Sequence, residues 1–281
     1  MTSVKILKDF KADAAVGVGG YASGPLLYAA SLKGVPYLIQ EQNSYAGVTN
    51  KRLGKKARKI CVAYDGMERF FPAEKIIITG NPIRKESVDI KGKRTQALEW
   101  SKLSGDKKII FLTGGSLGAR TLNESVLAGL AKIIAADIQL IWQTGKYYYP
   151  GIVETLGSDI HPNIRVMEFV DRMDLAYAAA DIIISRAGGT ISELCVAGKP
   201  AILVPSPNVA EDHQTTNAMS LVGKDAAIFV ADKDAETQLV DVAIRLLNDT
   251  GKQEILSANI SKLALPNADE VIAMEVFKMC G

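Results

Sequence analysis

The sequence has few of the side chains that build metal sites and hydrolytic triads. Its 281 residues include two histidines and three cysteines, and no two cysteines form a Cys-x-x-Cys pair. A structural zinc site needs closely spaced cysteine and histidine ligands, and a Ser-His-Asp triad needs a histidine beside its nucleophile. We therefore expect neither a zinc site nor a triad hydrolase. The separated cysteines favour ordinary thiols in a reducing compartment over a disulfide framework.

The sequence also lacks a large excess of charge of either sign and any long apolar run. The net charge of +2 is too small to attract nucleic acid by bulk electrostatics, so no nucleic-acid partner is expected. No apolar stretch reaches the ~18 residues of a membrane-spanning helix. Residues 1–10 are amphipathic rather than signal-like. With 48% apolar and 23% charged residues, the chain has enough apolar side chains for a packed core.

The sequence does contain a repeated alternation of short apolar strands and helices. This alternation predicts an α/β architecture of two doubly wound halves, each a parallel sheet covered by helices. The charged segment 85–106, with one expected helix, separates the halves. The expected strands are 14–18, 36–40, 59–64, 75–79, 108–113, 138–143, 164–169, 181–185, 200–204 and 226–230. The expected helices are 3–11 (with Val4, Leu7 and Phe10 on one face), 25–33, 46–57, 119–136, 172–180, 190–197, 212–223, 234–248, 251–263 and 267–279.

A glycine-rich loop, Gly114–Arg120, follows the apolar strand 108–113 and precedes the helix 119–136. In an α/β sheet this arrangement presents backbone N–H groups and a helix N-terminus to a phosphate group. The Ser116 hydroxyl can donate one more hydrogen bond to the same group. The Lys-Ser/Thr ending of a Walker motif is absent, and a Gly-Gly turn without any ligand remains the alternative interpretation.

Two further glycine-containing segments follow predicted strands. The loop Gly19–Pro25 suggests a second phosphate-bearing ligand, or one ligand held between two domains. In the cluster Ser185–Glu193, Glu193 lies in the first turn of a helix. Its carboxylate either accepts hydrogen bonds from a ribose diol or complements the helix dipole.

Polar and basic residues also occur at other strand ends and on one helix. Amides such as Gln214 and Asn43 suit sugar hydroxyls because each offers a donor and an acceptor, although amides are also common in solvated loops. Arg84 either pairs with a phosphate or carbonyl group or lies exposed at the boundary. The basic helix near 46–59 has two interpretations: it faces anionic lipid or a diphosphate, or it is a solvated helix face.

Seven motifs occur along the chain in the order typical of one family. They are Gly19–Pro25, Glu41–Lys51, Gly80–Arg84, Gly114–Arg120, Glu168–Met173, Arg186–Glu193 and Asp212–Gln214. On these motifs the chain resembles the bacterial MurG family over nearly its whole length. Members of this family transfer N-acetylglucosamine from UDP-N-acetylglucosamine to the undecaprenyl-diphosphate-linked muramyl pentapeptide, which turns lipid I into lipid II in peptidoglycan synthesis.

The resemblance implies a GT-B fold of two Rossmann-like domains, the first incomplete, with the donor in the cleft between them. Residues 1–84 would form the acceptor- and membrane-side domain, 85–266 the UDP-sugar donor domain, and 267–281 a helix that crosses back to the first domain. The implied partners are UDP-N-acetylglucosamine, lipid I and the anionic inner-membrane surface, with the protein peripheral on the cytoplasmic face. No cofactor is implied, and dependence on a divalent metal is left open.

The resemblance also implies roles for individual residues. Ser116 would touch the donor diphosphate, Val170 would pack at the uracil and Glu193 would bind the ribose hydroxyls. The other implied donor contacts are Asn43, Arg84, Gly189, Thr190, Ile191, Ser192 and Gln214. The acceptor diphosphate would face the loop residues Gly19, Gly20, Tyr21, Ser23 and Gly24.

Three departures from the family pattern bear on activity. The family's amino-terminal segment, with its Gly-Gly-Thr-Gly-Gly-His loop, is absent, so the chain looks as if it starts partway into its first domain. The turn Arg186–Thr190 is one residue shorter than in the family, which would shift the position of Glu193. Gln40 stands where some members of the family have histidine. We therefore expect impaired activity, with no assigned catalytic base. The alternatives are a non-catalytic UDP-sugar-binding remnant and another GT-B UDP-sugar enzyme, such as a sugar epimerase.

Overall fold

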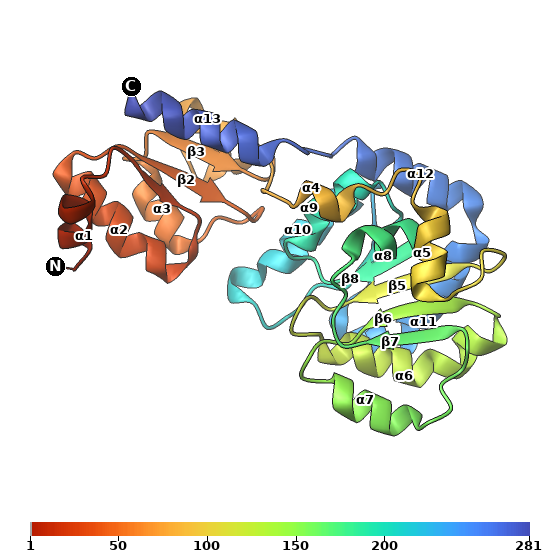
Figure 1. Ribbon diagram of the computed structural model, residues 1–281. Coiled ribbons are helices and arrows are strands. Elements are labelled where there is room, and N and C mark those ends of the chain that lie inside the picture. Colours follow the sequence, from red (N-terminus) through yellow and green to blue (C-terminus); the bar gives the residue numbers. More distant parts are fainter. Residues whose placement is uncertain (1) are drawn as a thin grey trace. The chain divides into compact units, whose positions relative to one another are not determined.

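The computed structural model describes residues 2–281 and divides into two compact units, each with one parallel sheet (Figure 1). Unit 1 is the chain up to Ile83 together with Leu265–Gly281, and unit 2 is Arg84–Ala264. Met1, which opens the expected first domain, lies outside the described residues. The α/β class with parallel sheets in both halves is confirmed. Arg84, placed in the first domain from sequence, is the first residue of unit 2.

The sheet of unit 1 has four parallel strands whose spatial order follows the chain. Its second strand is buried along its whole length, as expected of a parallel strand covered on both faces. The strands are β1 (Ala15–Gly17), β2 (Tyr37–Glu41), β3 (Lys59–Val62) and β4 (Ile76–Ile78). The helices of this part are α1 (Thr2–Phe10), α2 (Gly20–Lys33) and α3 (Val48–Gly54), with short 3₁₀ helices at Met67–Arg69 and Ala73–Lys75.

Helix α2 begins earlier than the sequence indicates. The segment expected to be a loop before Pro25 is already helical from Gly20, and the Ser23 hydroxyl donates to the Gly19 carbonyl oxygen over 3.0 Å. The prediction was wrong because Pro25 weakens the helix without ending it: α2 continues through Pro25, which lies in its second turn. Gly20, Tyr21, Ser23 and Gly24 therefore lie on the first turns of α2.

Helix α1 buries fewer apolar side chains than expected. Leu7 is 6% exposed and Val4 packs against the core of unit 1, but Phe10 is 81% exposed and Ile6 is 53% exposed. Phe10 is the last residue of the helix. The helix consequently leaves two large apolar side chains in solvent.

The last helix, α13 (Ala268–Cys280), packs on the sheet of unit 1 although it follows the whole of unit 2 in the chain. Ile272 is 9% exposed and packs with Leu38 of β2 and Cys61 of β3. Each aliphatic side chain buried in this way contributes roughly 1.5–3 kcal/mol. The C-terminal helix is thus a structural part of unit 1.

The sheet of unit 2 has six parallel strands in the order β10-β9-β8-β5-β6-β7. The chain enters at β5, moves outward through β6 and β7, and then returns to place β8 on the other side of β5. In such a sheet the connections on the two sides of the reversal diverge and leave a crevice at the carboxyl ends of the strands. The strands are β5 (Ile109–Thr113), β6 (Gln139–Gln143), β7 (Ile164–Met167), β8 (Ile182–Ser185), β9 (Ala201–Leu203) and β10 (Ile228–Phe229).

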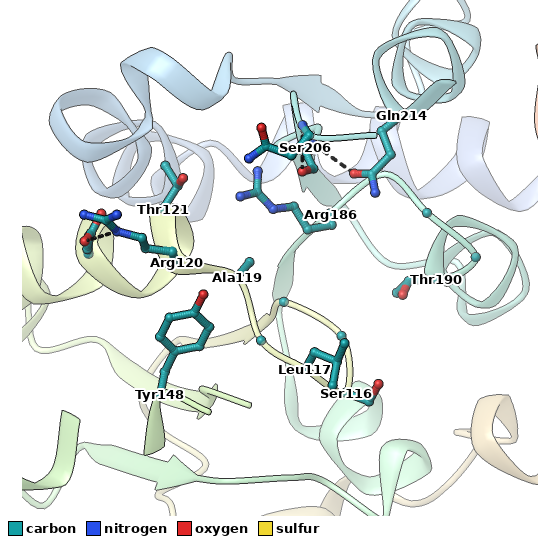
Figure 2. Close-up of a pocket in the computed structure, with 17 residues that line it drawn as sticks. Ser116, Leu117, Ala119, Arg120, Thr121, Tyr148, Arg186, Thr190, Ser206 and Gln214 are labelled. Atoms are coloured by element: carbon teal, nitrogen blue, oxygen red, sulfur yellow. Dashed lines mark hydrogen bonds and ion pairs between the residues drawn. The ribbon is translucent and has the colours of Figure 1, made fainter. Parts of the chain in front are cut away.

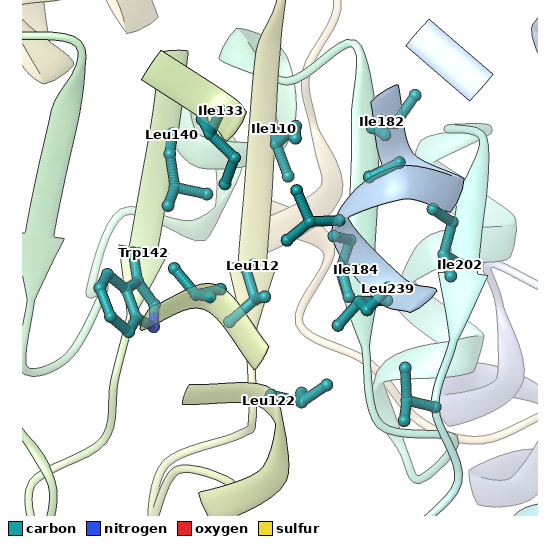
Figure 3. Packing of buried hydrophobic residues seen from close by; sticks show 14 of the residues in the cluster. Ile110, Leu112, Leu122, Ile133, Leu140, Trp142, Ile182, Ile184, Ile202 and Leu239 are labelled. Carbon is teal, nitrogen blue, oxygen red and sulfur yellow. The ribbon is translucent and has the colours of Figure 1, made fainter. Parts of the chain in front are cut away.

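Aliphatic side chains from the inner strands form the core of unit 2 together with helices that cover the sheet (Figure 3). Trp142 is fully buried there, and its indole N–H donates to Asn123 over 2.9 Å, which satisfies the one polar atom of the ring. The helices are α4 (Lys85–Val88), α5 (Arg94–Ser101), α6 (Arg120–Ala135), α7 (Tyr149–Leu156), α8 (Met173–Ala179), α9 (Thr190–Ala197), α10 (His213–Val222), α11 (Ala235–Asn248) and α12 (Thr250–Ser261). No helix within residues 2–281 is both long and apolar enough to cross a membrane.

Two helical segments of unit 2 were not expected. Helix α7 contains Pro150 and Gly151, which argue against a helix in its interior, but Pro150 lies in the first turn, where a missing N–H costs no hydrogen bond. The charged segment 85–106 contains two helices, α4 and α5, rather than one. Lys93 between them pairs with Asp174 of α8 at 3.0 Å, which attaches this segment to unit 2.

The three cysteines have different environments. Burial raises the pKa of Cys61 to about 11 and the pKa of Cys195 to about 12, so both stay protonated at neutral pH. Cys280 lies exposed near the end of α13. The three thiols are free, as expected of ordinary cysteines outside a disulfide framework.

Helices α6 and α11 pack most closely at Gly129, and this contact yields a test of the fold. A Cβ atom at position 129 would lie 2.3 Å from Val240 Cγ2. Gly129→Ala should therefore lower the free energy of unfolding by about 1–3 kcal/mol, because overpacking outweighs the better helix propensity of alanine. Urea unfolding followed by tryptophan fluorescence measures this for unit 2, since Trp100 and Trp142 both lie there.

The matched control is Gly151→Ala in α7, where a Cβ atom meets nothing within 4 Å. That substitution should leave the urea midpoint unchanged or raise it slightly. Equal midpoints for the two variants would contradict the packing described for α6 and α11.

Candidate functional site

A cavity of about 690 Å³ opens at the carboxyl edge of the unit 2 sheet, where the strand order reverses (Figure 2). Its walls come from the loops after β5, β8 and β9, from the start of α6 and α9, and from the turn after β6. The lining residues are Gly114, Gly115, Ser116, Leu117, Gly118, Ala119, Arg120, Thr121, Glu124, Tyr148, Arg186, Gly188, Gly189, Thr190, Ser206, Asn208 and Gln214. The cavity therefore occupies the usual ligand position of a doubly wound sheet.

The loop after β5 is a tight turn that lies directly on the turn after β6. Gly118 N–H donates to the Gly115 carbonyl oxygen over 3.1 Å, and both residues have φ of +81°. A Cβ atom at Gly118 would lie 2.1 Å from the Thr144 carbonyl oxygen, and one at Gly145 would lie 2.2 Å from Gly118 N. Only glycine allows the two backbones to approach so closely.

Helices α6 and α9 both begin beside this cavity, although in α9 the N–H groups of Ile191 and Ser192 already donate to the carbonyl oxygens of Gly188 and Gly189. The residues that precede α6 and α9, Ala119 and Gly189, make no capping hydrogen bond with a side chain. The first N–H groups of a helix have no acceptor within the helix and carry a partial positive charge. The hydroxyls of Ser116 and Thr190 line the same space (Figure 2). This arrangement suits an anion with several oxygen atoms, such as a phosphate or diphosphate.

Arg186 lies at the base of the cavity and is held firmly. Its guanidinium donates to the Val204 carbonyl oxygen over 3.0 Å and pairs with Asp232. The other oxygen of Asp232 accepts a hydrogen bond from the Thr121 hydroxyl over 3.1 Å. Because Asp232 offsets most of its charge, Arg186 acts as a fixed donor that connects the loops after β8 and β9 with α6.

Gln214, in the first turn of α10, offers a donor to the cavity. Its side-chain oxygen accepts from the Ser206 N–H over 2.9 Å, so its amide nitrogen is the group left for a ligand (Figure 2). A Cβ atom at Gly188 would lie 3.8 Å from this nitrogen, so the missing side chain keeps the approach to it open. Gln214 can consequently recognise an acceptor oxygen, such as that of a sugar hydroxyl or phosphate.

Glu193 lies one turn into α9, and a buried tyrosine orients it. One carboxylate oxygen accepts a hydrogen bond from the Tyr177 hydroxyl over 2.7 Å. Tyr177 is fully buried and packs edge-on against Phe111. Burial, with the nearby Glu193 carboxylate, raises the pKa of Tyr177 well above its usual value, so the phenol remains a donor. Glu193 is outside the residues that line the cavity, as are Ile191, Ser192 and Val170.

One buried carboxylate orders the loop of unit 1 that carries Asn43. Glu41 is 3% exposed and accepts from the N–H groups of Asn43 and Gly47 and from the Asn50 side chain, over 3.1, 3.0 and 2.8 Å. This contact fixes the loop that carries Asn43. Gln40, beside it, is buried and donates to Asn81 over 2.7 Å.

The cavity thus unites four of the predicted donor contacts, namely Ser116, Gly189, Thr190 and Gln214. Arg84 is exposed at the start of α4 and is not among the lining residues.

Sequence reasoning did not select Tyr148, Arg186 or Thr121 as site residues. Tyr148 follows β6 in a segment rich in tyrosine. Its position just after the end of a strand is the sequence feature that could have identified it as a site residue. Among residues 2–281, no three His, Cys, Asp or Glu side chains are grouped as ligands for a metal ion.

Two glycines of the loop allow a test of its tight packing. Gly115→Ala and Gly118→Ala both place alanine at a φ of +81°, which costs roughly 1–3 kcal/mol, but Gly115 has open space where Gly118 meets Thr144. Gly118→Ala should therefore lower the urea midpoint further than Gly115→Ala does, and it should weaken pyrophosphate binding more. Isothermal titration calorimetry with pyrophosphate measures the second effect, and equal losses for both variants would contradict the close contact of the two turns.

Comparisons with known proteins agree with this geometry. The family model for the glycosyltransferase family 28 C-terminal domain matches residues 109–272, and the model for the N-terminal domain of that family matches residues 1–62. A relative from Parabacteroides distasonis is 55% identical over 276 residues, which is 98% of this chain and 75% of the relative. One from Bacteroides thetaiotaomicron is 57% identical over 277 residues, which is 98% of this chain and 74% of the relative.

Both relatives are named UDP-N-acetylglucosamine–N-acetylmuramyl-(pentapeptide) pyrophosphoryl-undecaprenol N-acetylglucosamine transferase. The crystal structure of Acinetobacter baumannii MurG is 30% identical, with a TM-score of 0.79 over 99% of this chain and 76% of that one. The S. aureus MnaA–UDP structure shares the fold at 16% identity, with a TM-score of 0.71, covering 97% of this chain and 77% of that one. The chain therefore belongs to the MurG family of GT-B glycosyltransferases, within glycosyltransferase family 28.

Proposed function

We propose that this protein transfers N-acetylglucosamine from UDP-N-acetylglucosamine to the undecaprenyl-diphosphate-linked muramyl pentapeptide, converting lipid I into lipid II. The observation that carries the proposal is 55–57% identity, over 98% of the chain, to relatives named for this reaction. The anion-binding cavity of unit 2 supports it, because UDP is a diphosphate. Supply of lipid II would connect the protein to cell-wall growth, and through it to cell shape and division.

The proposed transfer is a displacement at the anomeric carbon of the donor sugar. The acceptor hydroxyl oxygen forms a bond to this carbon with inversion while the bond to the diphosphate oxygen breaks, and UDP leaves. Negative charge grows on the diphosphate during this step. The loop Gly114–Ala119 and the first turn of α6 offer N–H groups that are oriented before the reaction, which is the arrangement that stabilises a developing anion. The hydroxyl proton must pass to a base that we do not assign.

The uridine end of the donor is the proposed partner of Glu193. A carboxylate can accept two hydrogen bonds from the 2′- and 3′-hydroxyls of a ribose. The hydrogen bond from Tyr177 holds one of its oxygen atoms at a fixed position, which lowers the entropy lost when the ribose binds. Gln214, Asn43 and Arg84 are proposed contacts of the sugar and the diphosphate, in line with the family resemblance.

Glu193→Ala tests the ribose contact. Loss of hydrogen bonds to a charged group costs about 1.5–3 kcal/mol, so the Kd for UDP should rise roughly 10- to 100-fold. Calorimetry with UDP measures the change. The matched control is Glu236→Ala, which removes a carboxylate from the first turn of α11, outside the site. If both variants bind UDP like the unchanged protein, the assignment of Glu193 to the ribose fails.

Turnover separates the transferase from another enzyme on the same fold. The proposed reaction releases UDP only when lipid I or an analogue is present, whereas a sugar epimerase converts the donor without an acceptor. UDP release measured with and without the acceptor decides between them. Binding of UDP without any turnover would instead indicate a UDP-sugar-binding protein without activity.

We also propose that unit 1 meets the cytoplasmic face of the cell membrane, because the acceptor is a lipid. Exposed apolar side chains on α1 and α2 support this proposal, among them Phe10, Tyr28 and Leu32 at 81%, 59% and 60% exposure. Lysines occur on the same two helices. Apolar side chains with lysines beside them bind the surface of anionic bilayers.

The double substitution Ile6→Ser and Phe10→Ser should reduce binding to phosphatidylglycerol vesicles about tenfold or more, because two side chains lose their burial in lipid. Sedimentation with vesicles measures the bound fraction. Ile255→Ser, which changes a similarly exposed apolar residue in unit 2, is the control and should bind normally. A double variant that binds like the control would rule out α1 as a contact.

A further inference from the structure

We propose that Gln143 is a positioning residue for the donor, because its single carboxamide connects the loop after β5 with the loop after β7. This inference rests on the proposed function, since those loops carry the expected diphosphate and uracil contacts, Ser116 and Val170. Gln143 is the last residue of β6, the strand between β5 and β7. It lies opposite Thr113 on β5 and Met167 on β7. Its side chain can thus reach both neighbouring loops.

The nitrogen and the oxygen of this amide both make hydrogen bonds. Its nitrogen donates to the Thr113 hydroxyl oxygen over 2.9 Å and to the Gly115 carbonyl oxygen over 3.0 Å. Its oxygen accepts from the Val170 N–H over 2.8 Å. Gln143 is 3% exposed, so these hydrogen bonds form with little competition from water. The amide is therefore a fixed bridge rather than a mobile surface group.

The bridge sets the direction of the peptide between Gly115 and Ser116. In a trans peptide the C=O and the following N–H point in opposite directions. The Gly115 carbonyl faces Gln143 and also accepts from Gly118 N–H, so the Ser116 N–H must face away from Gln143. Ser116 lines the cavity. Gln143 thereby holds a backbone donor in the orientation that a phosphate oxygen needs.

The same reasoning applies at the other end of the bridge. The Val170 N–H faces Gln143, so the Phe169 carbonyl on the same peptide faces away from it. Val170 itself is fully buried and cannot shift without disturbing the core. One side chain consequently fixes the separation between the loop for the diphosphate and the loop for the base. Substitution of Gln143 should therefore weaken the binding of a ligand that spans both loops more than the binding of a ligand that contacts one loop.

The chain contains a matched control on the same strand. Gln139, the first residue of β6, is 2% exposed, and its amide makes two hydrogen bonds of 2.7 Å with the backbone of Ser104. It lies at the amino end of the sheet, away from the cavity. Gln139 and Gln143 are thus two buried, hydrogen-bonded glutamines of one strand, and they differ in the segments that their amides contact.

The test compares Gln143→Met with Gln139→Met, since methionine keeps the length of the side chain without its amide. Both variants should lose stability in urea. Gln143→Met alone should raise the Kd for UDP roughly 10- to 100-fold, because the Val170 N–H, the Thr113 hydroxyl and the Gly115 carbonyl each lose a hydrogen bond to the amide. The loss should be smaller for pyrophosphate alone. In turnover, the KM for UDP-N-acetylglucosamine should rise more than kcat falls.

Equal losses of UDP affinity in the two variants, or no loss in Gln143→Met, would overturn the inference. If Gln143→Met does not fold, Gln143→Glu replaces it. The carboxylate still accepts from Val170 but cannot donate to Gly115, so UDP should bind more weakly in this variant than in Gln139→Met, and equal binding would overturn the inference. If the unchanged protein fails to bind UDP, the proposed function fails instead, and the two outcomes stay distinct.

Discussion

The reversal of strand order at β5 is the constraint on which the pocket of unit 2 depends. Because β8 returns to the side of β5 opposite β6, the connections after β5 and β8 leave the sheet in different directions. Helices α6 and α9 then begin on two sides of one crevice, each without a side chain on its first donors. The proposed anion contacts at this point are largely backbone groups, so they depend on the geometry of the loops.

The strands could be predicted from sequence because parallel strands buried on both faces appear as short apolar runs. Ile109–Leu112 and Ile182–Ile184 are examples, and both were located within one residue. The order of the strands could not be predicted, since each run looks the same whichever strand lies beside it. Helix α7 and the start of α2 were missed because Pro150 and Pro25 suggest breaks, although Pro150 lies in the first turn of α7 and α2 continues through Pro25.

Part of the candidate site was also accessible from the sequence. Ser116 and Gln214 stand out because polar loops after apolar strands collect at the ligand edge of an α/β sheet. Gln143 did not stand out, because it looks like one polar residue at the end of a buried strand. Its significance lies in contacts with residues 28 and 27 positions away, which only the pairing of β6 with its neighbours reveals. Arg186 was similarly hidden, since its partner Asp232 is 46 positions along the chain.

Unit 1 is assembled from two distant pieces of chain, and this has a consequence during synthesis. Unit 2 is one continuous segment with its own core, so it can fold as soon as it leaves the ribosome. The sheet of unit 1 emerges first but must wait for the whole of unit 2 before α13 covers Leu38 and Cys61. In the nascent protein, unit 2 can therefore be complete while the sheet of unit 1 still exposes Leu38 and Cys61, which α13 later covers.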